Sequence, residues 1–462
     1  MKKWPLLVLT MFMGKPAIHA QEVLSLTAPS QPIVFAGVNV IRPGSETILT
    51  DQIVIVENGK IKELGRAGRV KIPTSSLAID GAGKYLLPGL AEMHAHIPAP
   101  EANGDLSMVK QTLFLYLCRG VTTLRGMLGQ PFHLNLKEKL AKQGITNMPV
   151  VYTSSPSFNG NSVPDVSTAE KLVKQYQSEG YDFLKIHPGI KVEVYDALTR
   201  TAKQVGIPFA GHVPVEVGVR HAIQSGQLTI DHLDGYIEAM APPLADLNQN
   251  GFFGFNLTDQ ADVNKIKGLA DLTKQKGTWL VPTQTLFTRW FSPEDPAAMM
   301  RQEEMAYMPS RTRFAWHQSK TNLIKSAGYT AEKYKAYLDI RKKLLLDLHQ
   351  SGVRLLLGSD APQVMNVPGF SIHHEMESWA EAGIPAWKIL QAGTSEVSRF
   401  FGTEKESGDI AVGQAANLIL LEQNPVERIE NIKTISGVMN QGIWMPKTVI
   451  EEELRKIAQA NQ

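Results

Sequence analysis

Titratable side chains stand at the carboxyl ends of several short apolar segments in this sequence of 462 residues. Residues two apart on a strand face the same side, so the imidazoles of His94 and His96 are expected to point to one place. Four imidazoles and a carboxylate suit zinc or a similar transition metal. One such residue alone is usually a satisfied polar group or a helix cap, so the prediction depends on the whole set. The set comprises His94, His96, Lys185, His212, His232 and Asp360.

The lysine and the scarcity of cysteine restrict the kind of metal site. The chain has one cysteine, Cys118, which excludes an internal disulfide and a zinc site of the Cys-pair type. An ammonium group cannot bind a metal, so Lys185 would be a ligand only if deprotonated or carbamylated by carbon dioxide. Otherwise Lys185 would be a substrate clamp or an ion-pair partner, and a single metal would be bound.

The elements that must position these side chains alternate between strand and helix. Most strand candidates are short apolar runs, as expected for strands buried on both faces. This alternation predicts an α/β fold with a (β/α)8 TIM-like barrel, in which active sites lie at the carboxyl ends of the strands. A doubly wound open sheet is the alternative, but no glycine-rich phosphate turn follows the first strand. The strand candidates are 89–97, 121–127, 149–155, 183–187, 208–213, 229–233, 279–283 and 354–360.

The two ends of the chain differ in pattern from the barrel, which we place at residues 88–403. Short strand patterns between Gly and Asn turns occupy residues 21–87 and return in residues 404–455. They predict one small β-sandwich domain built from both chain ends. Residues 284–345 exceed a normal connection between barrel elements. Such a segment is either a lid over the active site or a helical decoration on the outside of the barrel.

Residues 1–20 are typical of a secretory signal peptide. Two lysines precede a short apolar run, and Ala20 ends a stretch that suits cleavage. The run is too short to span a bilayer. No cysteine stands near the cut, which excludes a lipoprotein. Removal of residues 1–20 takes away three lysines and no acid, which changes the formal net charge from +2 to −1. We therefore expect a periplasmic or secreted protein without stable membrane insertion, although an N-terminal membrane anchor is the alternative. The sequence contains no basic patch of the kind that indicates nucleic-acid binding.

Several segments resemble the amidohydrolase superfamily, and the likeness extends over nearly the whole mature chain. The first-strand segment Lys84-Tyr-Leu-Leu-Pro-Gly-Leu-Ala-Glu-Met-His-Ala-His-Ile97 is the most characteristic of them. Within the superfamily the sequence is most similar to the imidazolonepropionase-like and Xaa-Pro dipeptidase-like branch. The other segments include Arg119-Gly-Val-Thr-Thr, Phe183-Leu-Lys-Ile, Ala210-Gly-His-Val, Ile230-Asp-His-Leu, Leu357-Gly-Ser-Asp, Ile372-His-His-Glu-Met and Ser407-Gly-Asp-Ile.

The resemblance implies a centre with two divalent metal ions, most commonly zinc. The more buried metal would be held by His94, His96 and Asp360, and the second by His212 and His232. Lys185, as a carbamate derived from carbon dioxide, would bridge the two. A hydroxide between the metals would attack the substrate carbonyl, and Asp360 would act as the general acid and base.

Other polar residues near the predicted strand ends are weaker candidates. Tyr236, His373, Arg125 and Tyr152 are predicted to bind substrate, and for each the alternative is a packing or barrel-core role. His187, two residues after Lys185, is either a further metal contact or a structural residue. Glu92 stands where the superfamily usually has Asp, and its side chain is expected to point away from the site.

Together these observations predict an exported metal-dependent amidohydrolase. The expected substrate is a small peptide or amino-acid derivative whose amide or peptide bond is hydrolysed. Hydrolysis of a cyclic amide, a lactone or an ester by the same centre is the alternative. A non-catalytic binding protein with a barrel fold would be expected to have lost some of the ligands, and none is missing here. The expected partner is a small molecule or dipeptide, and a homo-oligomer is possible.

Overall fold

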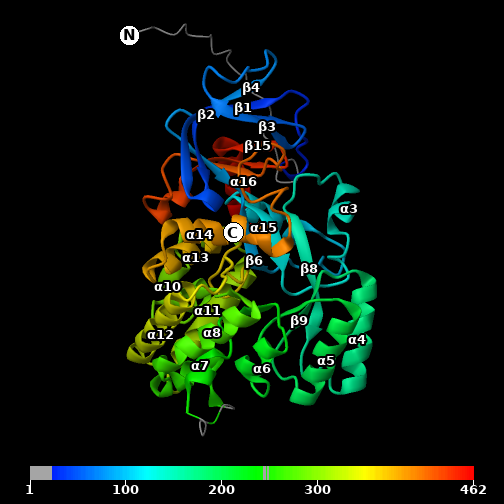
Figure 1. Ribbon diagram of the computed structural model, residues 1–462, viewed down its shortest axis with the longest axis vertical. Coiled ribbons are helices and arrows are strands. Elements are labelled where there is room, and N and C mark those ends of the chain that lie inside the picture. Colours follow the sequence, from blue (N-terminus) through cyan, green and yellow to red (C-terminus); the bar gives the residue numbers. More distant parts are fainter. Residues whose placement is uncertain (1–22, 243–245, 247–248, 462) are drawn as a thin grey trace.

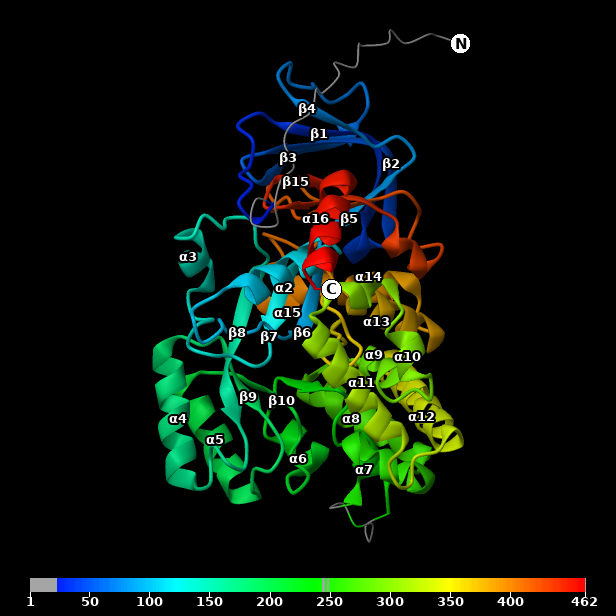
Figure 2. The ribbon, with the colours of Figure 1, turned by 180° about the vertical axis from the view of Figure 1, so that it is seen from behind.

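The computed structural model describes residues 23–242, 246 and 249–461. The predicted signal peptide, residues 1–20, lies outside the described residues. The chain forms two sheets, and the views in Figures 1 and 2 agree that the β domain lies at the opposite end of the molecule from helix α7 (Tyr236–Met240). In the described part of the chain, no helix combines the length and apolar character needed to cross a membrane.

The barrel sheet has seven parallel strands in sequential order, β6 to β12. The predicted eighth strand has no regular strand assignment, but its backbone bridges both neighbours, Leu355 to Leu280 and Ala361 to Ala95. The barrel is therefore closed, and the predicted (β/α)8 fold is confirmed. Burial on both faces explains why these strands are apolar. The strands are β6 (Leu90–Ala95), β7 (Val121–Gly126), β8 (Val150–Phe158), β9 (Phe183–Ile186), β10 (Phe209–Gly211), β11 (Thr229–Asp231) and β12 (Trp279–Val281).

Helices follow the barrel strands and cover their outer face (Figure 1). α4 shows the local signals well: the Asp165 carboxylate accepts a hydrogen bond from the Thr168 backbone N–H, and Gly180 ends the helix with a φ of 89°. The other helices outside the 284–345 insert are α2 (Ser107–Leu117), α3 (Leu136–Ala141), α5 (Val192–Val205), α6 (Gly218–Gln224), α7, α8 (Ile266–Lys276), α13 (Phe370–Glu381), α14 (Ala386–Ala392) and α15 (Ser395–Phe401).

The smaller domain joins the two ends of the chain. β5 pairs antiparallel with β13, with Leu86 opposite Leu420, so N-terminal and C-terminal strands form one continuous eight-stranded sheet. Its apolar core also takes residues from both ends, including Phe35 and Met439. The predicted β domain from both chain ends is thus confirmed. Its elements are β1 (Ile33–Arg42), β2 (Thr47–Glu57), β3 (Lys60–Arg66), β4 (Leu77–Asp80), β5 (Tyr85–Pro88), β13 (Leu418–Leu421), β14 (Ile435–Asn440), β15 (Ile443–Pro446) and α16 (Lys447–Ala460).

The segment at residues 284–345 is helical and packs on the barrel. It contains α9 (Gln284–Arg289), α10 (Pro296–Met299), α11 (Ser310–Ile324) and most of α12 (Ala331–Gln350). Arg341 of α12 is fully buried and donates to the backbone carbonyls of His232 and Pro282 at 2.9 and 3.1 Å. α12 therefore belongs to the barrel wall, which favours the packed alternative over a lid for this helix.

Candidate metal centre

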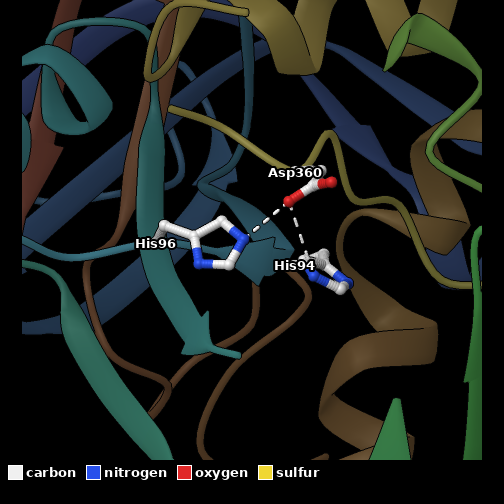
Figure 3. A group of neighbouring side chains, drawn as sticks. All are labelled: His94, His96 and Asp360. Carbon is white, nitrogen blue, oxygen red and sulfur yellow. Dashed lines mark hydrogen bonds and ion pairs between the residues drawn. The ribbon is translucent and has the colours of Figure 1, made fainter. Parts of the chain in front are cut away.

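Three of the predicted ligands converge at the mouth of the barrel (Figure 3). His96 Nε2 lies 2.6 Å and His94 Nε2 lies 3.6 Å from Asp360 Oδ1. The ligand atoms of the three residues all lie within 4.8 Å of one another. His94 and Asp360 are buried, at 1 % and 5 % exposure. This is a compact set of two imidazoles and one carboxylate, a donor set that suits a transition metal.

The remaining two histidines of the predicted set extend this group. The ring centroids of His94 and His232 lie 4.5 Å apart, and those of His232 and His212 lie 4.6 Å apart. His232 Nδ1 is also 3.9 Å from Asp360 Oδ2. All four predicted histidine ligands and the aspartate thus form one continuous cluster, although they come from four strand ends.

Carboxylates face the Nδ1 atoms of two of these rings. Nδ1 of His212 is hydrogen-bonded to Asp234 Oδ2 at 3.0 Å, and Nδ1 of His94 lies 3.0 Å from Asp231 Oδ2 without hydrogen-bond geometry. A carboxylate only accepts, so it favours the tautomer with the hydrogen on Nδ1 and leaves the Nε2 lone pair for a metal. His232 Nδ1 similarly pairs with the Thr283 hydroxyl at 2.8 Å.

Two ligands have a left-handed backbone, with φ values of 63° at His232 and 61° at Asp360. His and Asp adopt this conformation more readily than most residues, but it is still uncommon and tends to occur at functional sites. The turn at His232 matters because simple strand alternation would send its side chain to the opposite face from Asp231. Instead the side chains of Asp231 and His232 both lie in the same cluster, beside His94.

Lys185 lies in the interior of the barrel beside this cluster. Its side chain is fully buried, and its Nζ has no hydrogen-bond partner among the described residues. Burial lowers the pKa of Lys185 to about 8, although Asp231 and Asp360 oppose this shift. Its side chain runs past Gly211, where a Cβ atom would lie 3.0 Å from Lys185 Cδ and 2.6 Å from the Ile186 carbonyl oxygen.

The chemistry of this donor set fits a metal pair bridged by a carbamate. An unpaired buried ammonium is costly, and conversion of the amine to a carbamate would remove that charge and supply two ligand oxygens. Burial and neighbouring cationic groups lower the pKa of His94 and His232 well below the ordinary value, which favours the neutral form of both rings. Neutral imidazole is the form that binds metals.

The structure places Tyr236 and His373 away from the mouth, which contradicts the predicted roles in substrate binding. Tyr236 begins α7, and its hydroxyl donates to Thr273 Oγ1 on α8 at 2.7 Å. His373 lies in α13, and its Nε2 donates to the Arg119 carbonyl oxygen at 3.0 Å. Both side chains are buried between helices, so each holds two elements together.

Arg125 and Tyr152 likewise do not line the mouth. Arg125 is fully buried inside the barrel and donates to the Met93 carbonyl oxygen and to Thr229 Oγ1. Tyr152 lies near the start of β8, because that strand continues to Phe158, and its ring stacks on Phe401 at 3.7 Å. Tyr152 therefore lies toward the opposite end of the barrel from the ligands.

Glu92 is expected to point away from the site, and its place on β6 agrees with this, because it lies opposite Leu124, whose side chain belongs to the apolar core shared with the outer helices. The register of β6 against β7 shifts between Glu92 and Ala95, so the regular alternation of side chains is interrupted before His94. The Glu92 carboxylate accepts hydrogen bonds from the backbone N–H groups of His94 and Ser359 at 3.0 and 2.7 Å, and it also contacts the Ser359 hydroxyl. Burial raises the pKa of Glu92 to about 8. Glu92 thereby supports the strand ends that carry His94 and Asp360.

Sequence reasoning missed three further contributors to the site. Asp231 and Asp234 flank His232 in the sequence. A metal-binding histidine commonly donates its other ring N–H to a carboxylate, so these two aspartates could have been identified from the sequence. Phe253 gave no such signal, because it lies in the long segment after β11. Its ring lies 5.2 Å from His232 and 6.1 Å from His212, so it forms an aromatic wall of the mouth.

Comparisons with known proteins agree with this geometry. Residues 85–445 match the Amidohydrolase family. A bottromycin amidohydrolase structure superposes with a TM-score of 0.71 at 20 % identity, covering 96 % of this chain and 93 % of the other. Molinate hydrolase gives 0.66 at 16 % identity, covering 91 % and 95 %. A Xaa-Pro dipeptidase with bound methionine gives 0.63 at 18 % identity, covering 90 % and 100 %.

Matches to curated sequences are short. A dihydroorotase from Geobacter metallireducens is 45 % identical over 47 residues, which is 10 % of this chain and 11 % of that protein. One from Trichlorobacter lovleyi is 41 % identical over 70 residues, 15 % of each chain. The chain thus spans only a small part of the length of these relatives.

Proposed function

Because this chain belongs to the amidohydrolase family, whose members are metal-dependent hydrolases of carbon–nitrogen bonds, we propose that it is an exported hydrolase of small peptides or amino-acid derivatives. The observation that carries the proposal is the cluster of four imidazoles and Asp360 around the unpaired amine of Lys185. The Xaa-Pro dipeptidase among its structural neighbours supports the substrate class. Residues 1–20 support export.

We assign two metal ions, most commonly zinc, to this cluster. His94, His96 and Asp360 would hold one, His212 and His232 the other, and Lys185 as its carbamate would bridge them. When bound, such metals polarise a substrate carbonyl and lower the pKa of water to near neutrality.

The chain's own residues then transfer the proton, position the histidine rings and border the mouth of the barrel. Asp360 Oδ accepts a proton from the attacking water and donates it to the leaving amine nitrogen as the C–N bond breaks. Asp234 holds the ring of His212 by a hydrogen bond, and the Asp231 carboxylate lies beside the ring of His94. Phe253 borders the mouth and restricts access of water to the second pair of histidines.

Hydrolysis of a cyclic amide is the second candidate, because both short curated matches are to dihydroorotases. The two activities differ in the substrate accepted and share the same centre. A lactone or an ester would also place a carbonyl carbon before the attacking water.

The test combines metal analysis with a substrate panel. Purified protein loaded with zinc in the presence of bicarbonate should contain two metals per chain and hydrolyse members of a dipeptide library. Asp360→Asn should lower kcat by a factor on the order of 10³ or more, since general acid–base and ligand roles are lost together. Turnover of cyclic amides alone would favour the second candidate. A metal-free protein, or full activity in Asp360→Asn, would refute the mechanism.

A further inference from the structure

A fifth imidazole stands at the mouth of the barrel. His187 follows the end of β9, and its ring stacks on that of His212 with a centroid distance of 4.9 Å and an interplanar angle of 29°. The ring is partly exposed. Its Nε2 has no hydrogen-bond partner among the described residues, whereas its Nδ1 contacts Ser157 Oγ at 2.5 Å.

A chain of hydrogen bonds fixes which nitrogen of His187 carries the hydrogen. Asn159 Oδ1 accepts from the backbone N–H groups of Asn161 and Ser162, at 2.9 and 3.0 Å, which orients the Asn159 amide. Asn159 Nδ2 therefore donates to Ser157 Oγ, at 2.9 Å. The Ser157 hydroxyl has one hydrogen, and His187 Nδ1 is its remaining partner. The hydroxyl donates to Nδ1, so the hydrogen of the neutral ring is on Nε2.

This arrangement is the reverse of that at the predicted metal ligands. The Asp234 carboxylate accepts from Nδ1 of His212, and the Asp231 carboxylate lies 3.0 Å from Nδ1 of His94, so these contacts favour rings that present an Nε2 lone pair. His187 instead presents an Nε2–H group, which can donate a hydrogen bond but cannot bind a metal in this tautomer. The two kinds of ring stand next to each other, because His187 stacks on His212.

We propose that His187 is a catalytic residue whose Nε2–H donates to the oxygen of the scissile carbonyl and is not a metal ligand. The proposal rests on the proposed function only in that the substrate contains a carbonyl group. As the attacking water oxygen bonds to the carbonyl carbon, the π electron pair moves to the carbonyl oxygen, and His187 stabilises that negative charge. The pair returns when the C–N bond breaks and the leaving nitrogen takes the proton from Asp360.

The position of Tyr236 strengthens this assignment. A tyrosine hydroxyl following the His232 strand end would be a natural donor to the same oxygen, but the Tyr236 hydroxyl is buried against Thr273. His187 supplies a donor in its place. Removal of one preorganised donor to a developing oxyanion typically lowers kcat by a factor on the order of 10² to 10³.

Substitutions separate this role from metal binding. His187→Ala should lower kcat by a factor on the order of 10² or more with little change in KM, while the metal content by mass spectrometry stays at the wild-type value. His187→Gln keeps an N–H donor near the former Nε2 position and should recover part of the loss. Ser157→Ala removes the group that fixes the tautomer and should lower kcat by about 10-fold to 100-fold. The matched control is His221→Ala, since His221 lies on the half-exposed face of α6 and pairs with Asp196.

A measurement without substrate tests the same proposal. In protein labelled with ¹⁵N-histidine and loaded with zinc, the His187 signals are those that disappear in His187→Gln. Long-range ¹H–¹⁵N correlations should show a neutral ring protonated on Nε2. A ring protonated on Nδ1, loss of metal in His187→Ala, or an unchanged kcat in that variant would overturn the proposal. Failure of the dipeptide library alone would refute the proposed substrate class and leave these readouts intact.

Discussion

Two buried lysines, Lys185 in the barrel and Lys320 in α11 of the insert, differ in the partners of their ammonium groups. Lys185 Nζ has no hydrogen-bond partner among the described residues, whereas Lys320 Nζ donates to three backbone carbonyls and a hydroxyl at 2.6 to 3.2 Å. Burial lowers the pKa of each lysine to about 8. Only the ammonium group of Lys320 is compensated by acceptors. We therefore expect the charge of Lys185 to destabilise the folded protein and the hydrogen bonds of Lys320 to stabilise it.

We expect Lys185→Met to stabilise the metal-free protein. Replacement of an unpaired buried charge by an apolar side chain should raise the free energy of unfolding by about 3 kcal/mol at pH 7, a value that corresponds to the pKa shift from 10.5 to about 8. Urea unfolding after treatment with a chelator measures this change. Lys320→Met is the matched control and should destabilise, because buried carbonyls lose their donor. Equal effects of both substitutions would contradict this account.

The same pKa shift predicts a pH dependence for the metal-free protein. The folded pKa of Lys185 lies below its unfolded value of 10.5, so between about pH 8 and pH 10.5 the unfolded chain binds more protons. The penalty is fully present below pH 8 and is relieved as the pH rises through this window. The stability advantage of Lys185→Met over the wild type should therefore shrink between pH 8 and 10.5. An advantage that is constant over this range would argue against a charged Lys185.

Asp234 tests the support given to a predicted metal ligand. Its Oδ2 pairs with His212 Nδ1 at 3.0 Å and accepts from the Val213 backbone N–H at 3.1 Å. We expect Asp234→Asn to weaken metal binding by about 10-fold to 100-fold, because the amide no longer fixes the tautomer of His212. Competition with a chromogenic chelator measures the affinity. Asp196→Asn, which alters a carboxylate paired with surface His221, should leave it unchanged.

At the scale of elements, strand ends were predictable and the directions of side chains beyond them were not. His94, Lys185 and Asp360 could be placed from the sequence because the carboxyl ends of parallel strands meet at one edge. The side chain of Tyr236 could not be placed from the sequence, because Tyr236 is the first residue of a helix and its direction depends on the path of the backbone there. Tyr152 was misplaced because β8 continues beyond the predicted end at residue 155, through Pro156 and Ser157 to Phe158.

Helix α12 gives an element-scale prediction. Arg341 is fully buried, donates to Gln284 Oε1 and to the carbonyls of His232 and Pro282, and lies 3.4 Å from the centroid of the Phe287 ring. We expect Arg341→Lys to lower the free energy of unfolding by about 2 kcal/mol, because an ammonium cannot replace the planar fork and leaves acceptors unpaired.

Urea unfolding of the metal-loaded protein measures the effect of Arg341→Lys. Lys343→Ala is the control on the same helix, since the side chain of Lys343 is half exposed and makes a surface ion pair with Asp347. If α12 opened as a lid, Arg341→Lys would leave the stability close to that of the wild type and would change substrate access instead.

At the scale of the whole molecule, the β domain explains how the beginning of the chain is fixed. The N-terminal strands, which begin at Ile33, and the C-terminal strands complete each other through the β5–β13 pairing, which could be predicted because both ends show the same strand pattern. The packing of the first described residues could not be predicted. Val23 and Leu24 are buried, at 1 % and 0 % exposure, and the Leu24 carbonyl oxygen accepts from the backbone N–H groups of Thr146 and Asn147.

This packing bears on the predicted cleavage after Ala20. A cut there leaves Gln21 as the first residue and keeps Val23 and Leu24, whose burial contributes about 1.5 to 3 kcal/mol for each side chain. In a bacterial host that exports the protein, we therefore expect periplasmic protein whose mass and N-terminal sequence begin at Gln21. Ala20→Tyr places a large residue before the cut and should leave the unprocessed precursor. Removal of the chain through Leu24 should lower the stability, because two buried side chains are lost. Cytoplasmic protein that retains Met1 would refute export and would leave the proposed chemistry of the barrel untouched.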